Sequence, residues 1–303
     1  MRHEGVAMSL PEPVTLALRE AGLDPRYVED LVRATLEEDL GGGEDVTTTA
    51  TVPADQHAVA VLGSRESGVL AGLPVAEAVF AATDPGVEAE RHVADGAELR
   101  AGSKVLTVHG RTRQLLLAER TALNLACRLS GIATATRSWV DALAGTHAAV
   151  RDTRKTTPLL RPLEKYAVRL GGGVNHRSTL AESALIKDNH IAAAGGITAA
   201  YQAVKRAYPD IEVEVEVDDL DGAAEAVEAG ADLVLLDNFS VDDVLEAVKL
   251  VDGRARLEVS GGLTLAQAGA FAATGVDYLS TGALTHSVRS LDLGLDMVAV
   301  EGH

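Results

Sequence analysis

The chain has 303 residues, 47% of them hydrophobic, which allows one large or two medium domains with a sizeable core. Its formal net charge of -18 and its aromatic content of 3% argue against nucleic acids and anionic membranes as partners. The single cysteine, Cys127, excludes an intramolecular disulfide and a thiolate metal cluster and favours a cytoplasmic location.

The first part of the chain predicts a mixed α/β domain, without a signal sequence in residues 1–13 or a membrane span further along. Helices are expected over Val28–Leu40, which a glycine turn ends, and over Pro74–Ala82, where an early proline costs little. Short strands are expected at Ala58–Ser64, Gly68–Leu73 and Lys104–His109. These elements fit an antiparallel sheet with helices on one side.

A long helical stretch follows over Gly110–Ala144, because apolar residues recur in it at helical spacing. Gly131 lies near its middle, so we expect a kink or a split there. From about residue 147 the pattern changes to an alternation of strands and helices.

The alternating part predicts six strands, each followed by a connection that returns to the next one. The expected strands are Ala148–Asp152, Ala184–Lys187, Glu212–Val217, Leu233–Asp237, Arg256–Ser260 and Tyr278–Thr281. The expected helices between the later strands are Ile197–Tyr208, Asp219–Ala229, Val241–Val251 and Leu265–Ala273. This regular alternation favours a parallel barrel or partial barrel over a doubly wound sheet.

Cationic side chains gather between Arg151 and His190, where eight Lys or Arg stand against four acids. A local positive field inside an acidic protein suits a small polyanion, such as a substrate rich in phosphate and carboxylate groups. In a barrel, functional residues collect at the carboxyl ends of the strands. Polar residues follow almost every expected strand here, and the alternative is a solvated rim with ordinary loop charges. They include Asp152, Thr153, Arg154, Lys155, Lys187, Glu216 and Asp237.

Two turns of small residues, Ser260-Gly261-Gly262 and Ser280-Thr281-Gly282, follow the last two expected strands. Glycine lets backbone N–H groups approach an anion, and barrels commonly bind phosphate after their last strands, so these turns predict a phosphate site. Glu216 and Asp237 end neighbouring strands beside it. Carboxylates next to a diphosphate indicate Mg²⁺, although an ion pair with Arg or Lys would also explain them.

Lys155 and Lys187 leave a second chemistry open, because a desolvated lysine forms a Schiff base with a carbonyl substrate. Both have polar neighbours in the sequence, so charge pairing to an anion is the simpler interpretation. His176 and Arg177 follow a glycine run that supplies a flexible loop. Arginine at such a place suits a planar carboxylate, which its fork binds through two hydrogen bonds, whereas a lone histidine is as often structural.

Several segments together resemble the quinolinate phosphoribosyltransferase family (nicotinate-nucleotide pyrophosphorylase, carboxylating). They are EEDLGGGEDVTT (37–48), AERTALN (118–124), DTRKTTPLLRPLEKYAVRLGGGVNHR (152–177), LIKDNHI (185–191), VEVEVD (213–218), LLDNF (235–239), EVSGG (258–262) and DYLSTGALTHS (277–287). The likeness spans nearly the whole chain, and the block at 152–177 is the most specific part.

The resemblance implies an N-terminal α/β sandwich domain and an open, seven-stranded α/β barrel. We expect the sandwich domain over residues 1–125, with the tail 286–303 packed back on it, and the barrel over 126–285. It also implies at least a homodimer, with a hexamer as a possibility, and Mg²⁺ as the cofactor. The implied reaction converts quinolinate and phosphoribosyl pyrophosphate into nicotinate mononucleotide, pyrophosphate and carbon dioxide.

The resemblance also implies roles for individual residues. Those that would hold the two carboxylates of quinolinate are Arg154, His176, Arg177, Lys187 and, from the neighbouring subunit, Arg120. Lys155 would meet the pyrophosphate, and Glu216 and Asp237 would lie near the ribose and Mg²⁺. The 5-phosphate would be held by Ser260, Gly261, Gly262, Ser280, Thr281, Gly282 and His286, and Thr153 completes the expected substrate-binding set.

Three other interpretations stay open from the sequence. One is a paralogous phosphoribosyltransferase-like protein, of the kind associated with molybdenum transport genes, which the full set of cations disfavours. Another is a Schiff-base aldolase on a barrel, and the third is a catalytically silent metabolite-binding subunit. Turnover of quinolinate would separate the first from the expected enzyme, borohydride trapping would reveal the second, and ligand binding without product would support the third.

Overall fold

The computed structural model describes residues 9–301, which divide into two compact units. The first unit takes in the chain to Thr134, Pro162–Leu170 and the chain from Arg289; the second takes in Ala135–Arg161 and Gly171–Val288. Residues 1–8 of the stretch considered for a signal sequence, and residues 302–303 of the expected tail, lie outside the described part. Within that part, no helix is long and apolar enough to cross a membrane.

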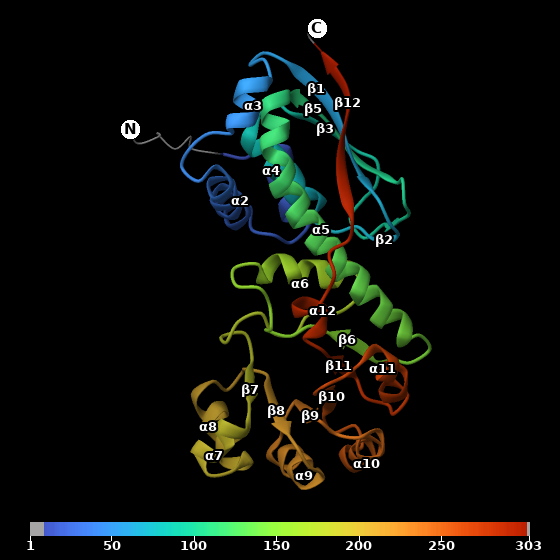
Figure 1. The fold of residues 1–303 in the computed structure, drawn as a ribbon. Helices are drawn as coiled ribbons and strands as arrows, with labels where there is room; N and C mark the ends of the chain where they lie inside the picture. Colours follow the sequence, from blue (N-terminus) through green and yellow to red (C-terminus); the bar gives the residue numbers. More distant parts are fainter. Residues whose placement is uncertain (1–8, 302–303) are drawn as a thin grey trace. The chain divides into compact units, whose positions relative to one another are not determined.

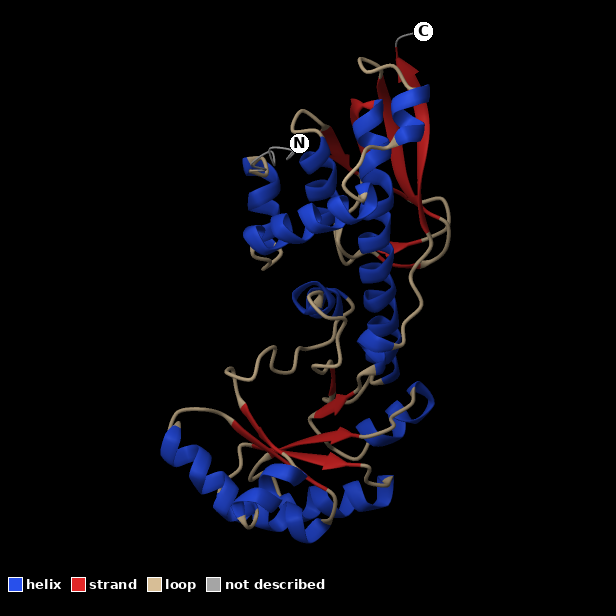
Figure 2. Ribbon diagram, turned by 60° about the vertical axis from the view of Figure 1, so that its left-hand side comes forward, coloured by secondary structure: helices blue, strands red, loops and turns tan. Residues whose placement is uncertain are grey.

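The first unit contains a four-stranded antiparallel sheet in the order β12-β1-β5-β3, and its helices gather on one side of that sheet (Figure 2). Its strands are β1 (His57–Ser64), β3 (Glu88–Arg91), β5 (Lys104–Arg111) and β12 (Leu293–Glu301). Alternate residues of β1 are buried, as expected for a strand with one face against a core. The C-terminal segment thus forms an edge strand of the first unit by pairing with β1.

The expected strand at Gly68–Leu73 is wrong in its second half. Only β2 (Gly68–Val69) is a strand, paired with β4 (Glu98–Leu99), and α4 already begins at Leu73 (Leu73–Thr83). The helix begins there because Gly72 adopts a φ of 96° and the Asp95 carboxylate accepts hydrogen bonds from the N–H groups of Gly72 and Leu73. The other helices before residue 112 are α1 (Glu12–Glu20), α2 (Pro25–Leu40) and α3 (Val46–Thr51).

The long helix α5 (Thr112–Ala142) is continuous, so the expected split at Gly131 is wrong. Gly131 serves a close backbone approach instead. A Cβ atom at this position would lie 2.2 Å from the carbonyl oxygen of Arg289. The glycine therefore lets the segment that leads into β12 run directly over the helix.

The second unit is built on a parallel sheet of six strands in the order β6-β11-β10-β9-β8-β7, which confirms all six predicted strands. They are β6 (Ala149–Arg151), β7 (Ala184–Ile186), β8 (Val213–Val217), β9 (Leu233–Asp237), β10 (Arg256–Ser260) and β11 (Tyr278–Ser280). An isolated parallel bridge joins Arg151 to Val174 beyond the sheet's β6 edge. The described residues of the second unit thus give six strands and one bridge, and the count of seven barrel strands is not confirmed.

Helices α8, α9 and α10 lie along one face of this sheet (Figure 1). The predicted helices are confirmed as α8 (Ile197–Ala207), α9 (Leu220–Ala229), α10 (Val241–Val251) and α11 (Leu265–Ala272). Three shorter or flanking helices complete the chain: α6 (Arg161–Leu170), α7 (Asp188–Ala194) and α12 (Ala283–His286). Along β8, buried valines alternate with Glu214 and Glu216, so these two glutamates share one face of the sheet.

Candidate active site

A cavity of ≈ 650 Å³ opens at the carboxyl ends of the strands of the second unit. Every expected site residue except Arg120 lines it: Thr153, Arg154, Lys155, His176, Arg177, Lys187, Glu216, Asp237, Ser260, Gly261, Gly262, Ser280, Thr281, Gly282 and His286. Arg120 is an exposed residue of α5 in the first unit. The cavity brings together four Lys or Arg with three carboxylates, the third being Glu258. A hollow of this size and mixed charge suits a polar small molecule.

Arg161 holds the loop that carries Arg154 and Lys155. Its guanidinium donates hydrogen bonds to Thr156 Oγ1 at 2.9 Å, to the carbonyl of Ser178 at 2.9 Å and to the carbonyl of Arg154 at 3.4 Å. Two irregular segments are thereby tied together beside the cavity. Arg161 is thus a supporting cation that the sequence grouped with the others, although it does not line the cavity.

The two turns of small residues lead into helical segments, as predicted. Ser260-Gly261-Gly262 precedes α11, and Ser280-Thr281-Gly282 precedes α12. Close packing explains one of the glycines: a Cβ atom at Gly282 would lie 2.9 Å from both Lys155 Cδ and His286 Nε2. The missing side chain therefore allows Lys155 and His286 to approach the same turn.

Glu216 and Asp237 end the adjacent strands β8 and β9, and both line the cavity. The Glu216 carboxylate forms an ion pair with Lys187 Nζ, so the ion-pair interpretation of this residue is confirmed. Asn238 Nδ2 donates a hydrogen bond to Asp237 Oδ2 at 2.7 Å. Two carboxylates at neighbouring strand ends, open to a cavity that two glycine turns also line, are a donor set that suits Mg²⁺ held jointly with substrate oxygens.

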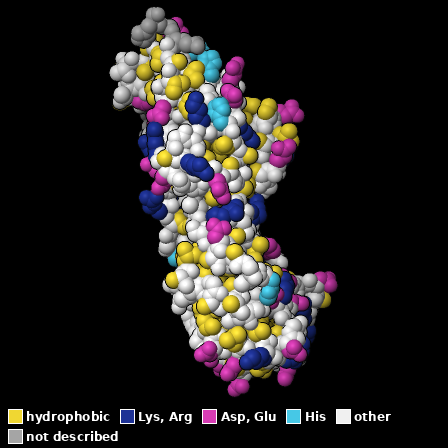
Figure 3. Space-filling view, turned by 90° about the vertical axis from the view of Figure 1, so that its right-hand side faces the viewer, with side chains coloured by type: hydrophobic (Ala, Val, Ile, Leu, Met, Phe, Trp, Pro, Cys, Tyr) yellow, Lys and Arg dark blue, Asp and Glu magenta, His cyan; other side chains and the backbone are white. Residues whose placement is uncertain are grey.

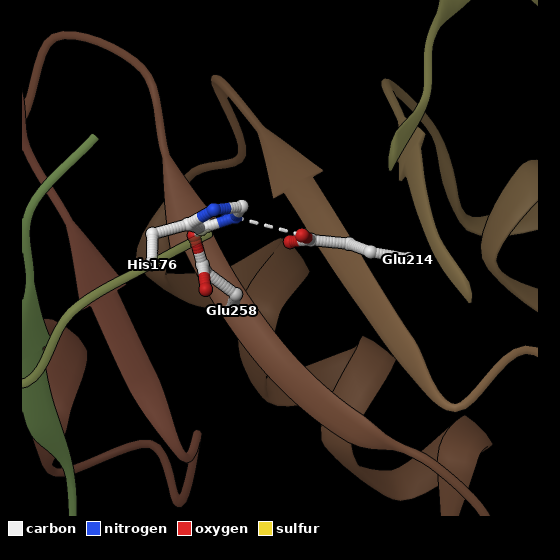
Figure 4. A group of neighbouring side chains, drawn as sticks. All are labelled: His176, Glu214 and Glu258. Atoms are coloured by element: carbon white, nitrogen blue, oxygen red, sulfur yellow. Dashed lines mark hydrogen bonds and ion pairs between the residues drawn. The ribbon is translucent and has the colours of Figure 1, made fainter. Parts of the chain in front are cut away.

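A buried cluster lies beneath these groups, where His176 stands between the carboxylates of Glu214 and Glu258 (Figure 4). His176 Nε2 lies 2.7 Å from Glu214 Oε2 and 3.8 Å from Glu258 Oε1, and Arg151 Nη1 lies 2.6 Å from Glu258 Oε2. Burial raises the pKa of Glu214 to about 7, although the nearby Arg151 and Arg177 guanidinium groups act to lower it. Burial, and next the charge of Glu214, raises the pKa of Glu258.

The donor atoms of His176, Glu214 and Glu258 lie within 4.8 Å of one another, a spacing that a metal ion could bridge. Arg151 already supplies a positive charge to Glu258, and the backbone N–H of Arg177 donates to His176 Nδ1 at 2.8 Å. The cluster is therefore tied together by ion pairs and hydrogen bonds within the protein, and the Oε1 atoms of Glu214 and Glu258 are buried without a hydrogen-bond partner.

In the sequence analysis, Asp152 was counted among the polar residues that follow strands but was assigned no partner, and Asn175, Glu214 and Glu258 were assigned no role. The signal for the glutamates was present, because alternation in VEVEV and RLEVS places Glu214 and Glu258 on the same sheet face as the strand-end residues. For Asp152 the position directly after β6 was a signal, whereas its pairing with the segment at Asn175 depends on the closed fold.

Acidic side chains are scattered among Lys and Arg over the face of the molecule drawn in Figure 3. Among the described residues of that face there is no continuous basic band of the kind that nucleic acid binding uses. In the cavity, by contrast, four Lys or Arg side chains lie together with three carboxylates.

Comparison with known protein families covers most of the chain. Residues 132–296 match the model of the quinolinate phosphoribosyl transferase C-terminal domain, and residues 45–130 match that of the N-terminal domain. A nicotinate-nucleotide pyrophosphorylase [carboxylating] of Mycobacterium leprae (strain TN) is 53% identical over 274 residues, which are 88% of this chain and 96% of the relative. A probable enzyme of the same name from Bacillus subtilis (strain 168) is 42% identical, with 86% and 90% covered.

Solved structures show the same architecture. The crystal structure of NadC from Streptococcus pyogenes superposes with a TM-score of 0.87 at 42% identity and covers 91% of this chain and 99% of its own. The nicotinate-nucleotide pyrophosphorylase from Francisella tularensis superposes with a TM-score of 0.86 at 39% identity, with 90% and 96% covered. The expected two-domain fold of α/β sandwich and α/β barrel is thereby confirmed.

Proposed function

The chain belongs to the quinolinate phosphoribosyl transferase family, and from this premise we propose the reaction that it catalyses. It transfers the phosphoribosyl group of phosphoribosyl pyrophosphate to quinolinate with decarboxylation, which yields nicotinate mononucleotide, pyrophosphate and carbon dioxide for NAD biosynthesis. The observation that carries this proposal is one cavity lined by cations, two glycine turns and a pair of strand-end carboxylates. These are the groups that a pyridine dicarboxylate and a ribose carrying phosphates require.

The dicarboxylate binds at the side of the cavity formed by Arg154, Arg177 and Lys187, with His176 among them. Burial, and next the charge of Arg154, lowers the pKa of Arg177. The Nε atoms of Arg154 and Arg177 are buried without a hydrogen-bond partner. A substrate carboxylate that meets these two guanidinium groups would relieve their repulsion and supply the absent acceptors.

The phosphorylated ribose binds at the turns that follow β10 and β11. Ser260, Ser280 and Thr281 offer hydroxyl groups beside the glycines Gly261, Gly262 and Gly282, and His286 lies next to the second turn, so these residues hold the 5-phosphate. Lys155 faces the pyrophosphate from the loop after β6, together with Thr153, whose Oγ1 accepts a hydrogen bond from the Lys155 N–H at 3.0 Å.

The reaction needs positioning and electrostatic stabilisation more than an activated protein nucleophile. The pyridine nitrogen attacks the ribose anomeric carbon as its bond to pyrophosphate breaks, and the carboxylates of Glu216 and Asp237 stabilise the positive charge that develops on the ribose. Lys155 neutralises the leaving pyrophosphate. Mg²⁺, when bound through Glu216 and Asp237, supplies further positive charge to the phosphate oxygens. The cationic ring then accepts the electron pair of the breaking carbon–carboxylate bond, and a proton replaces carbon dioxide.

A second copy of the chain completes the site in this proposal. Arg120 is exposed on α5, and the family resemblance assigns its contact with quinolinate to a neighbouring subunit in at least a homodimer. A cytoplasmic location belongs to the same proposal, and the free thiol of Cys127 supports it.

The test is an assay of purified protein with quinolinate, phosphoribosyl pyrophosphate and Mg²⁺, followed by mass detection of nicotinate mononucleotide and by release of carbon dioxide. We expect stoichiometric amounts of both products, and loss of both when the metal is removed with a chelator and restored by Mg²⁺. Folded protein that forms neither product with Mg²⁺ present would contradict the proposal.

A further inference from the structure

The segment Asn175–Arg177 delivers a cation to the cavity without belonging to a helix or a strand. Irregular backbone lacks the regular hydrogen bonds that would fix its path, so its position depends on bonds from other parts of the fold. Arg177 must also stay close to Arg154, whose like charge acts on it. Other contacts within the protein must therefore hold Arg177 near Arg154 when no substrate anion neutralises the two guanidinium groups.

Asp152 holds the backbone of this segment from the end of β6. Its side chain is fully buried. Oδ1 accepts a hydrogen bond from the N–H of His176 at 2.8 Å, and Oδ2 accepts one from Asn175 Nδ2 at 2.5 Å. The two oxygens of one carboxylate thus fix two successive residues, and hydrogen bonds from a charged acceptor are among the stronger ones in proteins.

Glu214 holds the same segment through the imidazole ring of His176. The backbone N–H of Arg177 donates to Nδ1 of His176 at 2.8 Å, so Nδ1 is the acceptor and Nε2 carries the proton. Nε2 then donates to Glu214 Oε2 at 2.7 Å. Both ring nitrogens are engaged within the protein, and a chain of hydrogen bonds runs from β8 through the ring to the backbone of Arg177.

We propose that Asp152 and Glu214 are positioning residues for the dicarboxylate side of the cavity: together they clamp Asn175–Arg177 and thereby aim the Arg177 guanidinium. Neither residue lines the cavity, so neither contacts the substrate. The guanidinium is fixed at its far end by a 2.7 Å hydrogen bond from Nη1 to the carbonyl of Ser183. In this arrangement His176 acts as a link between Glu214 and Arg177. The inference rests on the proposed function, because it concerns how quinolinate is recognised.

The test compares Glu214→Leu, which removes the acceptor, with Glu214→Gln, which keeps an oxygen for Nε2 and loses the charge. We expect Glu214→Leu to raise the KM for quinolinate about tenfold or more, because small displacements of a positioning group have effects of this size, while the KM for phosphoribosyl pyrophosphate changes less than about twofold. Glu214→Gln should recover most of the loss. Asp152→Asn, which keeps Oδ1 as an acceptor but places an amide against Asn175, should show the same split between the two substrates in milder form.

Glu212→Leu is the matched control. Glu212 lies two residues earlier on the same side of the strand path, pairs with Arg256 and does not line the cavity. This variant should leave both KM values unchanged, which separates the loss of an ion pair next to β8 from the loss of the clamp. Thermal unfolding of each variant shows whether it is folded, and if Glu214→Leu does not fold, Asp152→Asn and Glu214→Gln decide.

Equal losses for both substrates, or unchanged KM for quinolinate in folded Glu214→Leu and Asp152→Asn, would overturn the inference. A loss in Glu214→Gln as large as in Glu214→Leu would also overturn it, since the charge would then matter and the clamp would not. The wild-type protein is assayed first with quinolinate. Failure of the proposed function would appear there, whereas failure of the clamp would appear only in the variants.

Discussion

Gly261 lies against Asn238 at a distance that only a glycine permits. A Cβ atom at Gly261 would be 2.3 Å from Asn238 Oδ1 and 2.7 Å from Asn238 N, and Gly261 has a φ of 94°. Asn238 itself adopts a φ of 60° and donates its backbone N–H to the carbonyl of Ser260 at 2.9 Å. The end of β9, with Asp237, and the glycine turn after β10 are therefore held in close contact.

Gly261→Ala should damage the binding of phosphoribosyl pyrophosphate. Its methyl group would displace both the turn and Asn238, so we expect the KM for this substrate to rise about tenfold or more and the unfolding free energy to fall by about 2–4 kcal/mol. Gly253→Ala is the control, because its Cβ would meet nothing within 4 Å, only its φ of 70° is unfavourable, and it does not line the cavity. That variant should lose about 1 kcal/mol and keep its KM. Similar KM values in both variants would contradict the packing argument.

Arg154→Ala should weaken quinolinate and leave the fold intact. The substrate carboxylate loses a charged hydrogen-bond donor, which corresponds to about 2 kcal/mol, or roughly 30-fold in affinity. Steady-state kinetics and a thermal unfolding curve measure the two effects. Arg206→Ala, at an exposed position of α8, is the control and should behave as wild type. An unchanged KM for quinolinate would remove Arg154 from the site.

Hybrid dimers test whether Arg120 acts across a subunit interface. Arg120→Ala and Lys187→Ala damage different parts of the proposed site, so each homodimer should have little activity. Mixing the two proteins under conditions of subunit exchange should form hybrid dimers with one intact site each. Because about half of the dimers are then hybrids, the mixture should reach up to about a quarter of wild-type activity. Exchange is verified with differently tagged subunits. Proven exchange without recovery would show that the site is not shared.

Asp95 makes the stability of the first unit depend on pH. Burial raises the pKa of Asp95 above its usual value of 3.8, against the hydrogen bonds from Tyr166 and from the N–H groups of Leu73 and Gly72. A raised folded-state pKa contributes stability that is complete below pH 3.8 and is lost as the pH rises through the folded-state pKa.

Asp95→Asn should remove this contribution. The midpoint temperature of unfolding of the wild type should therefore fall relative to that of the variant as the pH rises from about 4 to 7. Thermal unfolding at several pH values measures it, with Asp39→Asn on the exposed surface of α2 as the control. A constant difference between wild type and Asp95→Asn across this range would refute the assignment.

The parallel strands could be predicted because each carries aliphatic residues, in a run or alternating with glutamate, and ends in polar or small residues at the site. β3 was missed because all four residues of Glu88–Arg91 are exposed and charged residues dominate it, so burial leaves no pattern in the sequence. The start of α4 was hidden because its capping group, Asp95, lies 22 residues further along the chain from Leu73. A local pattern does not contain such a partner.

The candidate site divides in the same way. Residues that follow strands directly, such as Arg154 and Lys187, could be assigned because a parallel sheet gathers strand ends at one edge. The hydrogen bonds of His176 to Glu214 and of Asp152 to Asn175 join segments 38 and 23 residues apart, and only the closed fold places them in contact. The resemblance placed His176 at the substrate. The hydrogen bonds that join its ring to Glu214 and to the backbone of Arg177 became visible only in the structure.

The central claim is that the cavity's cations recognise two adjacent carboxylates on a pyridine ring. The most direct measurement is the ratio of kcat/KM for quinolinate to that for nicotinate, which carries one of the two carboxylates, in the wild type and in Arg154→Ala. We predict a preference for quinolinate of about 100-fold or more in the wild type, because unpaired buried cations penalise the smaller acid, and a much smaller ratio in the variant. Equal use of both acids by the wild type, or a ratio that Arg154→Ala leaves unchanged, would contradict the account.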